Sequence, residues 1–428
     1  MKTTKDQTTS AMILRGSGLI LGALVTILAA RMLEPAGFGA FSFVLAIVTL
    51  LSSPLVAGLR QTLVREIAYA TGRKEPQRPT DVWTWVSRWA VWTTAGLVTV
   101  LGIWINWGVQ DAMLRWHLLL GIGLIILTPA PQLLSGVLLG FNKALRSQFP
   151  EFLVRPVLTL GLLVVADVFF VPGPMSVTVA LVILGVALLA DTLLCLVLVK
   201  EEPGIGAFRR NLSLTKEDRR DLMMSSLSFG AITSVYLINS NLDLVMLGIL
   251  ASDVDVGLYN AATLLASLAA FGLGVINTII MPQIAQLHAE GDRDALQAVI
   301  TRATRRITGI ACASAVLLWF GGTLALTLIF DASYTAGYTA MIILMLGQFA
   351  NACFGPVAII LNMTGHQKMT LIGLSVSVAV NGVLNFTLVP RFGIEGAAVA
   401  TTVSTVVWNV LLVWALKSRT GYRSTIFG

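Results

Sequence analysis

The sequence predicts an all-α integral membrane protein with about 12 transmembrane helices, in two six-helix bundles related by pseudo-two-fold symmetry, and with both termini in the cytoplasm. Three observations support this prediction: an apolar composition, a series of long apolar runs, and an unequal distribution of Lys and Arg between the loops. Hydrophobic residues make up 56% of the 428 positions, charged residues make up 12%, and the mean hydropathy is +0.83. Soluble domains carry about 25% charged residues, so lipid is expected to be the main solvent of this chain.

Apolar runs of about 20 residues recur along the whole chain, which is the length a helix needs to cross about 30 Å of hydrocarbon with its backbone hydrogen-bonded. The first run follows MKTTKDQTTS and reaches Ala30 without an A-x-A cleavage site, so it is predicted to be a retained anchor and not a signal peptide. We expect spans near residues 12–31, 37–58, 83–107, 116–139, 152–171, 175–199, 223–249, 256–281, 307–329, 337–362, 369–389 and 394–416.

The basic residues orient these spans, because cytoplasmic loops carry the excess of Lys and Arg. With the N-terminus inside, only Arg31, Arg115 and Arg391 of the 29 basic residues fall in outer segments. The net charge of +7 therefore lies beside the membrane, where it meets anionic headgroups, and we expect no nucleic-acid partner.

The longest polar stretch divides the chain into two halves of six spans each. We predict an N-terminal lobe at 1–199, a charged cytoplasmic linker at 200–222 and a C-terminal lobe at 223–428. The halves also resemble each other, because LEPAGFGAF at 33–41 is similar to SDVDVGLYN at 252–260, with Gly39 matching Gly257. Six spans return the chain to its starting side, so two such halves form parallel repeats about an axis along the membrane normal.

Several segments resemble polysaccharide-export flippases of the multidrug/oligosaccharidyl-lipid/polysaccharide exporter superfamily. They are LEPAGFGAFSFVLAI at 33–47, the loop at 281–306 that begins MPQIAQLHAEGD, and a run at 361–417 that includes NGVLNFTLVPRFGIEGAA. The resemblance implies a V-shaped pair of bundles and a multi-pass protein of the bacterial cytoplasmic (inner) membrane. It implies that the protein moves undecaprenyl-pyrophosphate-linked oligosaccharide by alternating access for cell-surface polysaccharide such as O-antigen lipopolysaccharide.

Other functions stay open at this point. Membership does not fix the cargo, so a cation-coupled drug exporter and a lipid II flippase of the same superfamily are alternatives. Lipid II flippases usually have fourteen spans, and the acidic residues typical of early drug-exporter helices are not seen here. A polysaccharide polymerase or ligase would need a large outer loop, whereas connections such as 171–175 and 251–256 are short.

No enzyme signature is present in the sequence, and no cofactor is expected. The pattern G-x-x-x-x-G-K-[ST] does not occur, and the three Cys and three His lack metal-site spacing. Transport would then draw on an ion gradient or on cargo supply and removal. The expected partners are the lipid-linked oligosaccharide, membrane lipids, a coupling proton or sodium ion, and polysaccharide polymerase machinery.

An anionic cargo needs cationic groups and hydrogen-bonding partners on its path. Arg15, just inside the first span, is a candidate for binding pyrophosphate, although an arginine near a helix end also snorkels readily to headgroups. Arg60 and Arg65 end the second span and are equally typical of interface anchors, with Arg60 kept as a cargo-binding candidate.

The seventh span carries the most informative polar stripe. Thr233, Tyr236, Ser240 and Asp243 recur at helical spacing on one face. Asn239 and Asn241 lie beside them. Asp243 is unfavourable at membrane depth unless it is paired, protonated or wetted, so we expect either a coupling carboxylate, a cargo contact or a buried structural carboxylate.

Two further spans hold polar candidates. Asp191, in the sixth span, is a second possible coupling group, with a structural role also open. Asn381 and Asn385 lie one turn apart in the eleventh span and suit either cavity lining or helix packing. Glu151 and Arg155 have the i, i+4 spacing of a local ion pair.

Overall fold

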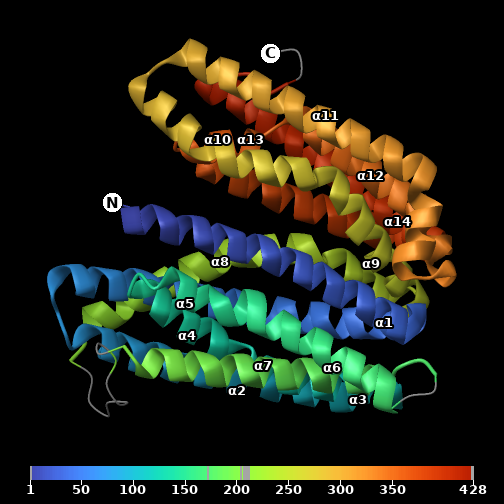
Figure 1. Cartoon of the computed structure of the whole chain (residues 1–428), viewed down its shortest axis with the longest axis horizontal. Helices are drawn as coiled ribbons and strands as arrows, with labels where there is room; N and C mark the ends of the chain where they lie inside the picture. Colours follow the sequence, from blue (N-terminus) through green and yellow to red (C-terminus); the bar gives the residue numbers. More distant parts are fainter. Residues whose placement is uncertain (1, 171–172, 203–204, 206–212, 426–428) are drawn as a thin grey trace. The chain divides into compact units, whose positions relative to one another are not determined.

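The computed structural model describes residues 2–170, 173–202, 205 and 213–425, and within these ranges the chain is helical with no strand (Figure 1). The α-helices are α1 (Lys2–Arg73), α2 (Arg78–Gly108), α3 (Ala112–Leu127), α4 (Pro129–Gly140), α5 (Ala144–Phe149), α6 (Arg155–Phe170), α7 (Val177–Lys200), α8 (Lys216–Leu250), α9 (Asp253–Ser267), α10 (Phe271–Glu290), α11 (Arg293–Ala325), α12 (Tyr338–Phe354), α13 (Val357–Met363) and α14 (Gln367–Thr420). The all-α membrane fold predicted from the sequence is confirmed.

In the described part of the chain, nine helices are long and apolar enough to cross a membrane, and the pair Asp253–Ala270 and Gly272–Glu290, bent by 45°, makes ten. Two of these helices are far longer than one crossing needs. Ile13–Arg73 has 61 residues, which at 1.5 Å per residue is about 90 Å, three times the hydrocarbon thickness. The number twelve stays a prediction, and the long helices leave room for it.

Both long helices contain a single non-helical residue where the sequence separates two spans. In α1 it is Glu34, with φ 57° and ψ 171°, and in α14 it is Gly393, with φ 55° and ψ −129°. A positive φ suits Gly393 because glycine has no Cβ. Glu34 has no such freedom, so its backbone is strained.

The described residues form two compact units. Unit 1 contains Met1–Leu33 and Val44–Leu237, and unit 2 contains Glu34–Phe43 and Ile238–Gly428. The unit boundaries therefore fall within α1 and α8. The functional division at 200–222 stays a prediction.

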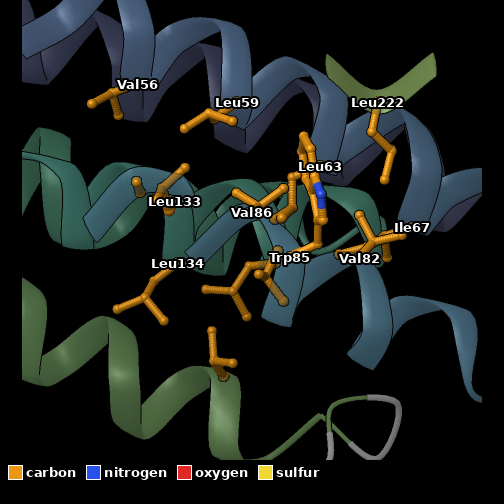
Figure 2. Close-up of a cluster of buried hydrophobic side chains, with 14 of the residues drawn as sticks. Val56, Leu59, Leu63, Ile67, Val82, Trp85, Val86, Leu133, Leu134 and Leu222 are labelled. Atoms are coloured by element: carbon orange, nitrogen blue, oxygen red, sulfur yellow. The ribbon is translucent and has the colours of Figure 1, made fainter. Parts of the chain in front are cut away.

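The core of unit 1 joins helices α1, α2, α4, α7 and α8 (Figure 2). Leu63 and Ile67 of α1, Trp85 of α2, Leu133 of α4 and Leu222 of α8 are each at most 5% exposed and belong to one cluster. Because lipid tails are as apolar as these side chains, close packing and hydrogen bonds hold such helices together, and the hydrophobic effect contributes little. Trp85 is therefore fixed in place by its neighbours.

Glycine allows two pairs of helices to approach closely. In unit 2, a Cβ on Gly39 of α1 would lie 1.7 Å from the carbonyl oxygen of Asp253, and a Cβ on Gly257 of α9 would lie 2.0 Å from that of Pro35. In unit 1, a Cβ on Gly58 would lie 2.2 Å from the carbonyl oxygen of Ser226 in α8. Backbones meet at these points as they do at small-residue contacts of membrane helices.

Candidate functional site

Unit 2 contains a buried carboxylate whose hydrogen-bond donors, among the described residues, are all neutral. Asp243 of α8 is 9% exposed. Its Oδ1 accepts hydrogen bonds from Asn381 Nδ2 at 3.0 Å and Asn385 Nδ2 at 2.8 Å. Its Oδ2 accepts from Tyr259 OH at 3.1 Å and Thr401 Oγ1 at 2.7 Å. We call these five residues the Asp243 cluster.

The kink in α14 explains how one helix supplies three of the five residues. Asn381 and Asn385 lie one turn apart before Gly393, so both amides project from the same face. Thr401 lies after Gly393, in the second arm of α14. Tyr259 comes from α9, where it is buried and also contacts the Thr401 hydroxyl at 3.0 Å. Both arms of α14 therefore reach the same carboxylate.

No cation lies beside Asp243 among the described residues, since no ion pair of this carboxyl group occurs there. The buried Asn385 Oδ1 also has no hydrogen-bond partner in that part of the chain. Burying an unpaired charge is unfavourable, so such a carboxylate gains from a proton or a small cation. Carboxylate, amide and hydroxyl oxygens are the ligands that hard cations prefer.

Only Asp243 of the polar stripe in the seventh span belongs to the Asp243 cluster. Of its predicted members, Asp243 is buried, Asn239 and Asn241 are half-buried, and Ser240 and Tyr236 are exposed, with Tyr236 at 44%. Tyr236 belongs to unit 1, whereas residues from Ile238 onward belong to unit 2. Asn381 joins Asp243, while Tyr259 and Thr401 were not predicted. Their only sequence signal is a polar group within an apolar run.

The two candidate arginines of α1 have different surroundings in unit 1. Arg15 is exposed, and its Nε donates a 3.0 Å hydrogen bond to Gln148 Oε1. Arg60 is half-buried. Its aliphatic chain packs against α4 at Gly136, where an added Cβ would lie 2.9 Å from Arg60 Cγ. The buried Arg60 Nε has no hydrogen-bond partner among the described residues.

Asp191 of α7 is the most deeply buried of the candidate carboxylates, at 1% exposed. Its Oδ2 lies 3.8 Å from Arg155 Nη1, and its Oδ1 accepts a hydrogen bond from Cys195 Sγ at 3.5 Å. The predicted ion pair between Glu151 and Arg155 is therefore wrong. Residues Pro150–Val154 form a π-helical segment, which rotates Glu151 away from the register of an i, i+4 pair.

Sequence reasoning also missed an ion network at one end of unit 1. Glu66 is 7% exposed and accepts hydrogen bonds from Arg65 at 2.9 Å and Arg78 at 3.2 Å. Arg78 reaches on to Asp218 of α8 at 3.1 Å. The network links α1, α2 and α8. Only the adjacent pair Arg65 and Glu66 was visible as a local sequence feature.

Comparison with known proteins finds similarity to a protein family over much of the chain and to the fold of several solved structures. Residues 5–288 match the model of the family described as polysaccharide biosynthesis protein. Over 181 residues, the chain is 26% identical to "Probable low-salt glycan biosynthesis flippase Agl15" of Haloferax volcanii. That alignment covers 41% of this chain and 38% of the relative's length.

Solved transporter structures share the fold at low sequence identity. An inward-facing multidrug resistance MATE family transporter of the MOP superfamily superposes with a TM-score of 0.74 at 14% identity, covering 96% of this chain and 99% of that one. Lipid II flippase MurJ in an inward closed conformation superposes with a TM-score of 0.76 at 13% identity, covering 96% and 87%.

Proposed function

The chain belongs to the polysaccharide biosynthesis protein family, and on that basis we propose that this multi-pass membrane protein is a flippase for lipid-linked oligosaccharide. The proposed cargo is an undecaprenyl-pyrophosphate-linked oligosaccharide that is moved across the cytoplasmic membrane for surface polysaccharide. The name of the Haloferax volcanii relative supports this class of cargo. The proposed topology keeps both termini in the cytoplasm, as the distribution of Lys and Arg predicts.

Arginines of α1 are the proposed contacts for the pyrophosphate. A guanidinium forms paired hydrogen bonds to phosphate oxygens, and Arg60 holds a buried Nε with no partner among the described residues. Arg15 is exposed and hydrogen-bonded to a neutral amide only. Tyr236, Asn239, Ser240 and Asn241 are proposed to supply hydrogen bonds to the sugar hydroxyls.

The Asp243 cluster is the proposed coupling site, and it is the observation on which the transport mechanism depends. A sodium ion or a proton at the carboxylate would neutralise the buried charge and change what Asn381, Asn385 and Thr401 donate to. These donors lie on both arms of α14, so occupancy of the carboxylate would alter how the arms pack. An ion that favours one packing arrangement of the arms over the other would shift the balance between the two transport states. Ion binding would in this way be coupled to alternating access. Asp191, which already has a cationic neighbour, is assigned a structural role.

Complementation tests the cargo class. A host that lacks its own oligosaccharide flippase would receive the native chain, and surface polysaccharide would be measured. Restored polysaccharide that is lost in Arg60→Ala and in Asp243→Asn supports the proposal. If the well-expressed native chain restores nothing but confers drug resistance, the cargo assignment is wrong and the drug-exporter alternative holds. Rescue of a strain without its lipid II flippase would favour the other alternative.

A further inference from the structure

Unit 1 has a hollow that the proposed transport path does not use. It is a cavity of about 480 Å³ lined by Trp85, Arg88, Trp89 and Trp92 of α2 and by Arg219 and Arg220 of α8. The α2 residues have i, i+3, i+4 and i+7 spacing, so they form one face of that helix. The cavity therefore presents an aromatic wall from α2 and a cationic wall from both helices.

The deep end of this hollow is packed into the core of unit 1. Trp85 is 5% exposed and belongs to the core cluster with Leu63, Ile67 and Leu222 (Figure 2). Trp89 lies next to it with a ring-centroid distance of 6.0 Å, while Trp92 is 74% exposed. The indole wall thus runs from the protein interior to the surface, and its deep end is held by packing.

The charge of the lining has one sign. Among the residues that the structure describes, three arginines line the cavity and no acidic residue does. Two carboxylates adjoin these arginines in the sequence, and neither lines the cavity. Asp218 accepts hydrogen bonds from Thr215 and Arg78 instead, and Asp221 is exposed. Within the described residues, neither Arg219 nor Arg220 forms an ion pair. The cavity is therefore complementary to an anion.

The position along the helices indicates that the anion is part of a lipid. Arg219 and Arg220 immediately precede the apolar run at 223–249, and Arg88 lies within the first two turns of the run at 83–107. Arginine and tryptophan at the end of a membrane span lie at headgroup depth, and basic pockets between spans bind anionic headgroups. Exposed Trp92 continues toward the acyl region.

We propose that this hollow binds the headgroup of an anionic phospholipid, such as phosphatidylglycerol, with its phosphate on Arg88, Arg219 and Arg220 and one acyl chain along Trp89 and Trp92. The bound lipid joins α2 to α8. Because α8 continues from unit 1 into unit 2, the lipid holds the α8 segment that leads to Asp243. The ligand is a structural lipid of the membrane and is separate from the transported cargo.

Lipid retention by the purified full-length chain tests this site without any transport assay. The chain would be offered phosphatidylglycerol or phosphatidylcholine, and bound lipid would be counted by native mass spectrometry. The double variant Arg219→Gln/Arg220→Gln removes two cations, and we expect about tenfold or greater loss of phosphatidylglycerol binding. Arg305→Gln/Arg306→Gln is the matched control, because this pair immediately precedes the apolar run at 307–329 and does not line the hollow.

Three results would overturn the proposal. They are equal retention of the two lipids by the native chain, equal losses in the test and control variants, and displacement of phosphatidylglycerol by a polyprenyl pyrophosphate at stoichiometric concentration. The third would make the hollow part of the cargo path. Trp89→Leu, which keeps all three cations, provides a second variant if the double variant does not fold, and it should weaken binding of the acylated lipid but not of glycerophosphate. Failure of complementation would leave these binding results unaffected.

Discussion

Asn385 donates a 2.8 Å hydrogen bond to Oδ1 of Asp243 although 142 residues separate the two in the sequence. The pair joins the C-terminal third of α8 to the first arm of α14, and Thr401 of the second arm binds the other carboxylate oxygen. Because its donors among the described residues are neutral, the carboxyl group of Asp243 should respond strongly to the binding of a proton or a small cation. The first two substitutions change this carboxyl group or one of its donors.

Asp243→Asn should abolish ion-driven transport while leaving the protein folded. The substitution keeps the size of the side chain and removes a buried charge that has no cationic partner among the described residues, so folding loses little. We expect transport driven by a sodium or proton gradient in proteoliposomes to fall at least tenfold, with the melting temperature unchanged within a few degrees. Transport at the native rate would show that the carboxylate has a structural role only.

Thr401→Val should weaken the coupling-ion response. Valine has nearly the shape of threonine but cannot donate to Asp243 Oδ2, so the carboxylate loses one of four hydrogen bonds, worth about 1–3 kcal/mol at a charged, buried group. The ion concentration for half-maximal transport should change about tenfold. Thr387→Val is the control, because the Thr387 hydroxyl bonds to the Val383 carbonyl of its own helix. Equal effects of both variants would contradict the prediction.

Gly39→Ala should destabilise unit 2. The added Cβ would lie 1.7 Å from a backbone oxygen of α9, so the helices must separate, at a cost of about 1–3 kcal/mol. Gly96→Ala in α2 is the control, because the added Cβ would meet no neighbouring atom within 4 Å. This variant should stabilise its helix by up to about 1 kcal/mol. Thermal melting in detergent, followed by tryptophan fluorescence, should therefore show shifts of opposite sign.

Glu66→Gln should loosen the contact between α1, α2 and α8. The variant keeps the shape but removes the charge that Arg65 and Arg78 share. Both arginines are about one third exposed, which screens the interaction, so the expected loss is about 1–2 kcal/mol of unfolding free energy. Glu75→Gln should change stability little, since Glu75 lies 3.9 Å from Arg78 and is 42% exposed. Comparable losses in both variants would refute a special role for Glu66.

The sequence predicted the helical membrane class because that class follows from composition and run length alone. The sequence also singled out Asp243, Asn381 and Asn385, since a polar side chain within an apolar run is conspicuous. The remaining members of the cluster depend on tertiary geometry. Tyr259 and Thr401 meet Asp243 only because α9 and the kinked α14 pack around α8, and no local spacing encodes that meeting.

Local rules failed where the helix itself was irregular. Glu151 and Arg155 had the spacing of an ion pair, but the π-helical segment Pro150–Val154 changed their register, and Arg155 instead lies beside Asp191 of the next helix. The role of Arg78 was similarly hidden, because the two carboxylates to which it donates hydrogen bonds are 12 and 140 residues away in the sequence. The i, i+4 spacing brings two side chains together only in a regular α-helix, and membrane helices often depart from regular geometry.

The contact between Gly39 and Gly257 limits what can change at either position. Gly39 is the seventh residue of LEPAGFGAF and Gly257 the sixth of SDVDVGLYN, so the two stretches correspond with an offset of one residue. Each glycine lies against the backbone beside the other. A Cβ on either glycine would overlap a backbone oxygen of the facing helix. Enlarging one residue cannot be offset by shrinking the other, because the other already lacks a side chain. The two positions therefore tolerate mutation only if the backbone itself moves.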